Sequence, residues 1–294
     1  MKSTYSGPIV IGGVGGSGTR VIAELLQMLG VFIGNDLNES LDNLAFTLLF
    51  KRKAWYSRNC YNEPQLNRGL SIIEKAMTFE RKFTFQEYLF IFKAMTVMSI
   101  KGHNREKAGN GRWSLVRAKN IIMAPNNENA IYQAWGWKEP NSHLILPTLT
   151  SFFCDLKYIH CIRSGLDMAF SPNQQQLYNW GSLFNVHPSE PGINIHEAAF
   201  RYWVEANRQA IETGKKLGPA KFLLLNYDQL CENPETGVKS IIDFLGLNAD
   251  EHMIAKMISL PEKPATTNRY RNNDVSWLSQ EDAYFMKTLG FETH

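Results

Sequence analysis

Five glycines within seven residues near the start of the chain constrain its fold more than any other feature. Residues 12–20 read Gly-Gly-Val-Gly-Gly-Ser-Gly-Thr-Arg. The apolar run before them, residues 8–12, predicts a buried parallel strand, and apolar side chains at helical spacing predict a helix over residues 19–29. A second strand over residues 31–33 completes a strand–helix–strand unit. Such a unit, with its right-handed crossover, indicates an α/β fold.

The same glycines indicate a phosphate-binding site. The first turn of a helix presents unpaired backbone N–H groups and a positive dipole end, and glycines let the backbone approach an anion closely. A turn with only a structural role needs one or two glycines rather than five. We therefore expect phosphate to be bound by Gly15, Gly16, Ser17, Gly18, Thr19 and Arg20.

The second half of the chain adds strands and helices to this beginning. Strands are predicted at residues 134–138, 156–162 and 221–227. An amphipathic helix is predicted over residues 195–217, and a helix that begins at a proline over residues 234–245. Together with the first unit they predict a central parallel β-sheet flanked by helices.

Between the second and third strands, about residues 37–130, the sequence predicts only helices. Helical patterns cover residues 41–50, 65–77 and 85–98, and a polar loop is expected over residues 103–113. We interpret this stretch as a helical insertion over the sheet. No linker-like segment divides the chain, so one domain over residues 1–294 is expected.

The bulk composition narrows the class of protein. With 294 residues, 44% of them apolar, the chain can bury a sizeable core, and a net charge of +3 suits anionic ligands without the basic stripe of a nucleic-acid binder. Residues 1–7 hold no apolar signal core, and no apolar run approaches the ~20 residues of a membrane span. We therefore expect a cytoplasmic protein with no nucleic-acid partner and no stable membrane insertion. The four cysteines form no C-x-x-C pair and are expected as reduced, buried thiols, whereas the oligomeric state is not predicted.

Two familiar glycine loops match residues 13–18 in part. A Walker A loop, as in P-loop kinases, has this glycine spacing but requires a lysine where Thr19 stands. The Rossmann pattern G-x-G-x-x-G matches literally, and Asp36 lies about 20 residues on, where a ribose-binding acid belongs, which would predict an NAD(P)-dependent oxidoreductase. The long helical stretch after the second strand, however, interrupts the regular alternation of a dinucleotide-binding fold.

A third loop fits the sequence better. Residues 16–20, Gly-Ser-Gly-Thr-Arg, carry the core of the [KR]-S-G-T-[ST] loop, and they resemble the loop with which sulfotransferases hold the 5′-phosphosulfate of 3′-phosphoadenosine-5′-phosphosulfate (PAPS). Gly16 stands where that family usually has a lysine or arginine. Whether Arg20 replaces that cation is left open.

Residues 157–171 extend the resemblance to the sulfotransferase family. A predicted strand ends in Arg163, and Ser171 follows eight residues later, at the expected start of a helix. An arginine and a serine at this spacing resemble the family's 3′-phosphate site, where the guanidinium offers a bidentate, permanently charged fork. Arg163 could instead pair with Asp167 as a surface cap.

Two C-terminal segments are also similar to this family. Residues 221–234 resemble its strand followed by Tyr-Asp-x-Leu and a helix that starts at proline. Many members carry a basic segment that closes over the 3′-phosphate, and this resemblance makes Arg269 and Arg271 candidates for that role. Solvated loop charges are the alternative interpretation.

The resemblance implies a PAPS-dependent sulfotransferase that works by in-line displacement, releases 3′-phosphoadenosine-5′-phosphate (PAP) and needs no metal. Lys138, at a predicted strand end, lies near the place where the family often has a lysine that stabilises the sulfuryl oxygens. A general base should work near neutral pH, which for a carboxylate requires burial. The candidates, in order of preference, are Asp36, Glu139 and His143, followed by Glu39 and Asp42.

The acceptor is expected to be a small molecule or a glycan. Aromatic residues of the insertion could stack against a sugar or lipid-like acceptor, but a helix core explains them equally well. Tyr202 or Trp203 could stack against adenine, or belong to the core. Besides a sulfotransferase, a non-catalytic nucleotide-binding module, an oxidoreductase and a P-loop kinase remain as alternatives.

Overall fold

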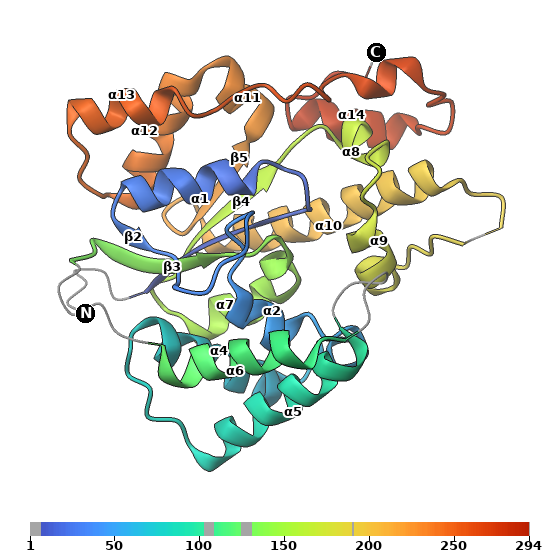
Figure 1. Ribbon diagram of the computed structural model, residues 1–294. Coiled ribbons are helices and arrows are strands. Elements are labelled where there is room, and N and C mark those ends of the chain that lie inside the picture. Colours follow the sequence, from blue (N-terminus) through green and yellow to red (C-terminus); the bar gives the residue numbers. More distant parts are fainter. Residues whose placement is uncertain (1–6, 103–108, 125–130, 190, 294) are drawn as a thin grey trace.

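A parallel sheet lies at the centre of the protein (Figure 1). The computed structural model describes residues 7–102, 109–124, 131–189 and 191–293. Five strands pair in the order β2-β3-β1-β4-β5, all of them parallel. Their bounds are β1 (Pro8–Gly13), β2 (Val31–Phe32), β3 (Ala134–Lys138), β4 (Lys157–Ile162) and β5 (Phe222–Asn226). The predicted parallel α/β fold is therefore confirmed.

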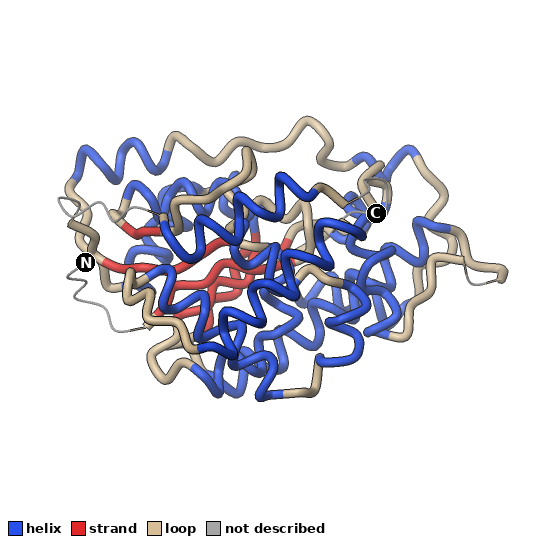
Figure 2. Tube along the Cα trace, turned by 60° about the horizontal axis from the view of Figure 1, so that its bottom comes forward, coloured by secondary structure: helices blue, strands red, loops and turns tan. Residues whose placement is uncertain are grey.

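The strands are apolar on both faces because helices cover both faces. In β1, Ile9 and Ile11 belong to one buried cluster, whereas Val10 between them belongs to the other. The cluster around Ile9 packs under four helices: α1 (Thr19–Met28), α11 (Tyr227–Glu232), α12 (Pro234–Leu245) and α13 (Glu251–Ile258). Figure 2 shows the strands enclosed by helices.

The second cluster lies between the sheet and a larger helical layer. Two of its helices follow the sheet strands in sequence, α7 (Leu146–Phe152) and α10 (Ile195–Leu217). The others lie between β2 and β3 in sequence and gather on one side of the sheet in Figure 1: α2 (Leu44–Phe50), α3 (Lys53–Asn59), α4 (Glu63–Met77), α5 (Phe85–Lys101) and α6 (Gly111–Met123). The described residues of this stretch thus form helices, as the insertion was expected to do.

One boundary of the insertion was predicted wrongly. The polar loop was expected to run to residue 113, but α6 already begins at Gly111 because the Asn110 side chain accepts a hydrogen bond from the backbone N–H of Trp113. Residues 103–108 of that loop lie outside the described residues. In the same layer, Thr84 and Glu87 form a capping box that starts α5.

The remaining helices surround the carboxyl edge of the sheet and the C-terminus. They are α8 (Gly165–Ala169), α9 (Gln175–Trp180), α14 (Gln280–Thr288) and the 3₁₀ turns η1 (Pro140–Ile145), η2 (Gly181–Phe184) and η3 (Arg269–Asn272). Among the residues that the structure describes, no helix is long and apolar enough to span a membrane.

Parallel strands bring three motifs of the sequence to one edge. Gly13 ends β1, Lys138 ends β3, and Arg163 directly follows β4. The register pairs Ile11 with Lys138 and Gly13 with Cys161. The loops after β1, β3 and β4 are therefore neighbours, and this edge is where ligands bind in open α/β sheets.

Candidate active site

A cavity of about 450 Å³ lies at this edge of the sheet. The glycine loop, the end of β3, the segment from Ser171 to α9, and α10 form its walls. Of the residues predicted for the site, the cavity is lined by Gly15, Gly16, Gly18, Thr19, Arg20, Lys138, Glu139 and Ser171. Residues of three segments far apart in the sequence therefore line one cavity.

Backbone conformation explains two of the loop glycines. Gly16 and Gly18 have φ angles of 93° and 86°, in the left-handed region that glycine adopts at little cost. A Cβ atom on Gly18 would also collide with the ring of Tyr227. Gly18 is the N-cap of α1 but provides no side-chain cap, so the first turn of α1 keeps N–H groups that face an incoming anion.

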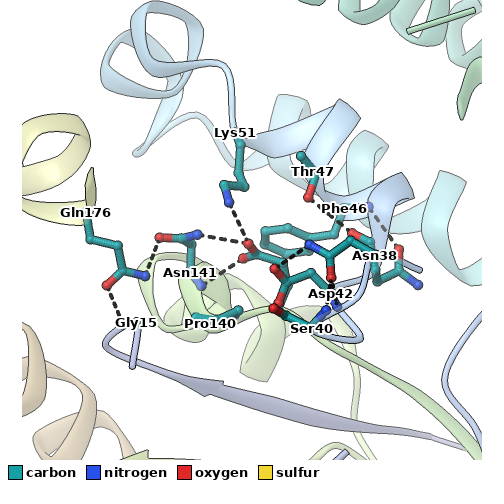
Figure 3. A network of polar contacts seen from close by, with 12 residues as sticks. Gly15, Asn38, Ser40, Asp42, Phe46, Thr47, Lys51, Pro140, Asn141 and Gln176 are labelled. Atoms are coloured by element: carbon teal, nitrogen blue, oxygen red, sulfur yellow. Dashed lines mark hydrogen bonds and ion pairs between the residues drawn. The ribbon is translucent and has the colours of Figure 1, made fainter. Parts of the chain in front are cut away.

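A glutamine side chain occupies one of these donors. The backbone N–H of Gly15 donates to Oε1 of Gln176 at 2.6 Å, and Nε2 of Gln176 donates to Oδ1 of Asn141 at 2.8 Å (Figure 3). The carboxamide oxygen stands where an anionic oxygen of a ligand would accept the same hydrogen bond. The sequence analysis missed Gln176, which lies within a run of three glutamines that carries no periodic signal.

Two polar side chains of the loop, those of Ser17 and Arg20, differ in burial and in their position relative to the cavity. The Ser17 hydroxyl is buried and has no hydrogen-bond partner among the described residues, and Ser17 does not line the cavity. Arg20 lines the cavity, but its side chain is 60% exposed and pairs with Glu24 at 3.4 Å along α1. The structure thus leaves Arg20 at the mouth rather than within the loop.

Lys138 and Asp42 form an ion pair on the cavity wall. The side chain of Lys138 is 3% exposed and that of Asp42 17%, and the Lys138 ammonium also donates to the backbone oxygen of Ser40 at 2.8 Å. Asn38 fixes Asp42 by donating to its Oδ2 at 2.9 Å and accepting from its backbone N–H at 2.8 Å. An ammonium and a carboxylate are therefore held side by side at the carboxyl edge of the sheet.

Glu139 is the centre of a buried network. It is fully buried, and its Oε1 accepts from Lys51 at 3.0 Å and from Nδ2 of Asn141 at 2.9 Å, while its Oε2 accepts from the backbone N–H of Asn141 at 2.8 Å. Figure 3 shows Lys51 reaching this carboxylate from the insertion and Asn141 connecting it to Gln176. Both carboxylate oxygens already accept hydrogen bonds.

Two further general-base candidates, Asp36 and His143, do not line this cavity. Asp36 pairs with Arg117 of α6 at 3.1 Å and lines a separate cavity of only about 30 Å³. His143 is buried, its Nδ1 lies 2.9 Å from the backbone oxygen of Pro140, and burial lowers its pKa to about 4. The structure therefore brings neither Asp36 nor His143 to the cavity beside Lys138, and it brings Asp42 instead.

The residues predicted for a 3′-phosphate are only partly gathered. Arg163 is buried; its Nη2 donates to Oγ1 of Thr266 at 3.1 Å, and its Nε lies 3.7 Å from Oδ1 of Asp228. It does not line the cavity, and Asp228 rather than Asp167 is its acidic neighbour. Ser171 does line the cavity, but it lies in the turn after α8 and not at the start of a helix, so that expectation was wrong.

The C-terminal basic segment separates into two parts. Asp167 accepts from the backbone N–H groups of Asn268 and Tyr270, which holds this segment against α8. Arg269 donates from Nε to the backbone oxygen of Thr266 at 3.1 Å, and Arg163 donates to the hydroxyl of the same residue, so Thr266 joins the two cations. Burial and the charge of Arg163 both lower the pKa of Arg269. Arg271 points elsewhere, because it is exposed and pairs with Glu292 at 2.8 Å.

The two residues that were considered for stacking against adenine belong to the hydrophobic core and also line the cavity. Tyr202 and Trp203 of α10 line the cavity, yet both are almost fully buried. Trp203 packs against Phe200 and Phe291. Their contacts explain them as core residues.

This geometry, a glycine loop after β1 and a buried lysine at the end of β3 lining one cavity, is that of a site for an anionic group at the edge of a parallel sheet. The model of the sulfotransferase family matches residues 8–251. The chain belongs to the sulfotransferase family, which confirms the resemblance noted in the sequence.

Solved structures with the same fold support this assignment at the level of architecture. The sulfotransferase domain of the olefin synthase from Synechococcus PCC 7002 is similar with a TM-score of 0.51 and 15% identity, covering 100% of this chain and 98% of that one. The sulfotransferase domain of the curacin biosynthetic pathway gives 0.50 and 13%, covering all of both chains. At such identities the likeness shows the fold alone. A comparison with curated proteins found no match.

Proposed function

We propose that this protein transfers a sulfuryl group from PAPS to a hydroxyl, or an amine, of a small molecule or glycan by in-line displacement. The observation that carries the proposal is the shared cavity: in a chain of the sulfotransferase family, the N–H groups of the glycine loop and the Lys138–Asp42 pair line the same 450 Å³ space. A module that only bound a nucleotide would not need the second feature.

The residues present suit the two anionic ends of the donor. Toward the 5′ end, the N–H of Gly15 already donates to a neutral oxygen of Gln176, which an anion would replace favourably. Toward the 3′ end, Arg163 and Arg269 both donate hydrogen bonds to Thr266, and Ser171 lines the cavity. Arg271 is not part of this arrangement.

When bound, PAPS would supply the sulfuryl group and a phosphate as the leaving group. During the transfer, negative charge would spread over the sulfuryl oxygens and the oxygen that bridges sulfur and the leaving phosphate. The ammonium of Lys138, which is almost fully buried, would stabilise this charge more strongly than an exposed cation could. Asp42, held by Asn38 beside Lys138, would accept the proton of the acceptor hydroxyl. Glu139 has both oxygens engaged, so its contacts favour a positioning role for Lys51 and Asn141.

The first experiment measures PAP binding by calorimetry, with the 3′-dephosphorylated nucleotide as control. Arg163→Ala and Arg269→Ala should each weaken PAP binding at least about tenfold, as expected for the loss of a hydrogen bond to a charged group. Arg271→Ala is the matched control and should bind like the unchanged protein. Equal affinity for both nucleotides would contradict the proposed donor.

The second experiment separates Asp42 from Asp36. PAP release from PAPS is followed in the presence of a mixture of sugars and phenols. Asp42→Asn should lower the rate by about 10²–10⁴-fold, the usual contribution of a general base, whereas Asp36→Asn should change it by less than about threefold. PAP binding without any turnover would leave a nucleotide-binding module as the better description.

A further inference from the structure

A second, larger cavity adjoins the first. It has a volume of about 1170 Å³ and lies between α3, α5 and the segment of α9 and η2. Lys51, Leu177 and Asn179 line both cavities. A molecule held in the larger cavity could therefore extend a hydroxyl toward Lys138 and Asp42.

The lining of this larger cavity is strongly cationic. It includes Lys51, Arg52, Lys53, Arg58, Lys93 and Lys101, and no aspartate or glutamate lines it. Lys51 is paired with Glu139, and Lys53 donates to the backbone oxygen of Tyr178 at 2.6 Å. Within the described part of the chain, Lys51 is the one cation of the six that forms an ion pair. The concentration of charge is notable in a protein whose net charge is only +3.

Arg52 is the most unusual of these cations. Its side chain is buried, 3% exposed, with the guanidinium 4.1 Å from the ring centroid of Trp55 and 4.9 Å from that of Phe90. Its Nε and Nη2 donate to the backbone oxygen of Leu49 at 3.0 and 2.8 Å, and burial lowers its pKa to about 9. A buried cation without a counter-ion gains more from a bound anion than a solvated one does, because its own desolvation has already occurred on folding.

Apolar surface accompanies the charges. Trp55, Phe90, Phe92 and Tyr178 line the same cavity, and Phe92 is a large exposed hydrophobic residue. Rings and cations together suit a molecule with an anionic group and an apolar ring or chain. A neutral acceptor would leave the five cations other than Lys51 without an anionic partner.

From these observations we infer that the acceptor is itself an anion: a hydroxyl-bearing small molecule with a carboxylate, phosphate or sulfate group and an apolar ring or chain, whose charge binds between α3 and α5. This inference rests on the proposed sulfuryl transfer for the identity of the reaction. The binding of an anion in the larger cavity can be tested separately from that reaction.

The test uses three fluorescent probes with the same ring system. 4-Methylumbelliferyl β-D-glucuronide carries a carboxylate, the corresponding glucoside carries a hydroxymethyl group at that position, and the glucoside 6-phosphate carries a dianion. Binding to the unchanged protein is measured by fluorescence anisotropy at low and high salt. At low salt, one or both anionic probes should bind at least about tenfold more tightly than the glucoside, and the preference should shrink as salt screens the charges.

Variants locate the binding. Arg52→Gln should weaken binding of the anionic probes about tenfold or more. Lys93→Gln, at an exposed position where the fold does not depend on the side chain, should weaken it about two- to fivefold. Lys256→Gln removes the same charge from α13, outside the cavity, and should have no effect. None of the three should alter binding of the glucoside.

The outcomes separate this inference from the proposed function. Equal binding of glucoside and anionic probes, no binding of any probe, or an anion preference that survives in both Arg52→Gln and Lys93→Gln would overturn it. Competition between PAP and the glucuronide would also overturn it, because the cavity would then belong to the donor. An anion preference in a protein that does not bind PAP would support the anion site in the larger cavity but refute both the sulfuryl transfer and the role of the anion as its acceptor.

Discussion

The ion pair between Lys138 and Asp42 gives the sharpest test of the proposed chemistry. Lys138→Met keeps the length of the side chain and removes its charge, which leaves the Asp42 carboxylate, 17% exposed, with Asn38 as its remaining side-chain partner. Asp42→Asn leaves the ammonium, 3% exposed, with the Ser40 backbone oxygen. Removing one partner of a buried pair costs about 3–5 kcal/mol, and the partial exposure of Asp42 reduces this to about 2–4 kcal/mol for each variant.

A double-mutant cycle then distinguishes a real pair from two independent residues. The double variant has no unpaired charge, so it should lose less stability than the sum of the single losses, with a coupling energy of about 1–3 kcal/mol in urea unfolding. Lys138→Met should also lower PAP release from PAPS by about 10²–10³-fold, the effect of removing one preorganised stabilising group. Additive unfolding energies, or a rate within tenfold of the unchanged protein, would refute this reasoning.

Three further predictions concern the glycine loop and a buried histidine. Gly18→Ala should cost at least about 1–3 kcal/mol in urea unfolding and weaken PAP binding, since φ is 86° and the new methyl group meets the ring of Tyr227; unchanged stability would contradict this account. Gln176→Glu places a carboxylate at the N–H of Gly15, so calorimetry should show PAP binding weakened about tenfold, while Gln176→Ala should not weaken it. Burial lowers the pKa of His143 to about 4, whereas in the unfolded chain this histidine takes up its proton near pH 6.5. The contribution of the neutral histidine to the free energy of unfolding is therefore fully present above pH 6.5 and is lost as the pH falls toward 4. At about 1.36 kcal/mol per pH unit, His143 accounts for about 2 kcal/mol between pH 6.5 and 5, and His143→Asn should lack this part of the acid dependence in urea unfolding.

The sequence predicted the sheet well because its strands are buried on both faces. Continuous apolar runs such as that of β1 leave few alternatives, and the helices over residues 195–217 and 234–245 were predicted with the bounds that the structure gives them. The start of α6 was missed although a signal was present, since Asn110 is a good N-cap residue directly before Gly111.

Which carboxylate lies beside Lys138 depends on tertiary structure that cannot be predicted from the spacing of residues in the sequence. Asp36 follows β2 by only a few residues, which made it the preferred general-base candidate. The loop then turns back, and a β-bridge connects Leu37 to Asn43. The backbone N–H of Asn43 donates to the oxygen of Lys138 at 2.8 Å, which brings Asp42 to the lysine while Asp36 turns to Arg117. No spacing rule predicts such a reversal. Gln176 was equally hidden, because its role comes from the packing of α9 against the glycine loop.

Glu139 connects the two cavities, and its substitution by glutamine should show this connection. The carboxylate accepts three hydrogen bonds, two from Asn141 and one from Lys51, whereas glutamine offers one acceptor oxygen and adds a donor. At least one buried donor then loses its partner, at a cost of about 1–3 kcal/mol in unfolding free energy. Because Asn141 holds Gln176 at the N–H of Gly15 and Lys51 lines both cavities, binding of PAP and of the anionic probe should change together. Gln176→Ala is the matched comparison, since it removes the contact to Gly15 but leaves Lys51 paired, and it should weaken the binding of neither PAP nor the anionic probe. A Glu139→Gln protein in which only one ligand is affected would show that the two cavities are independent.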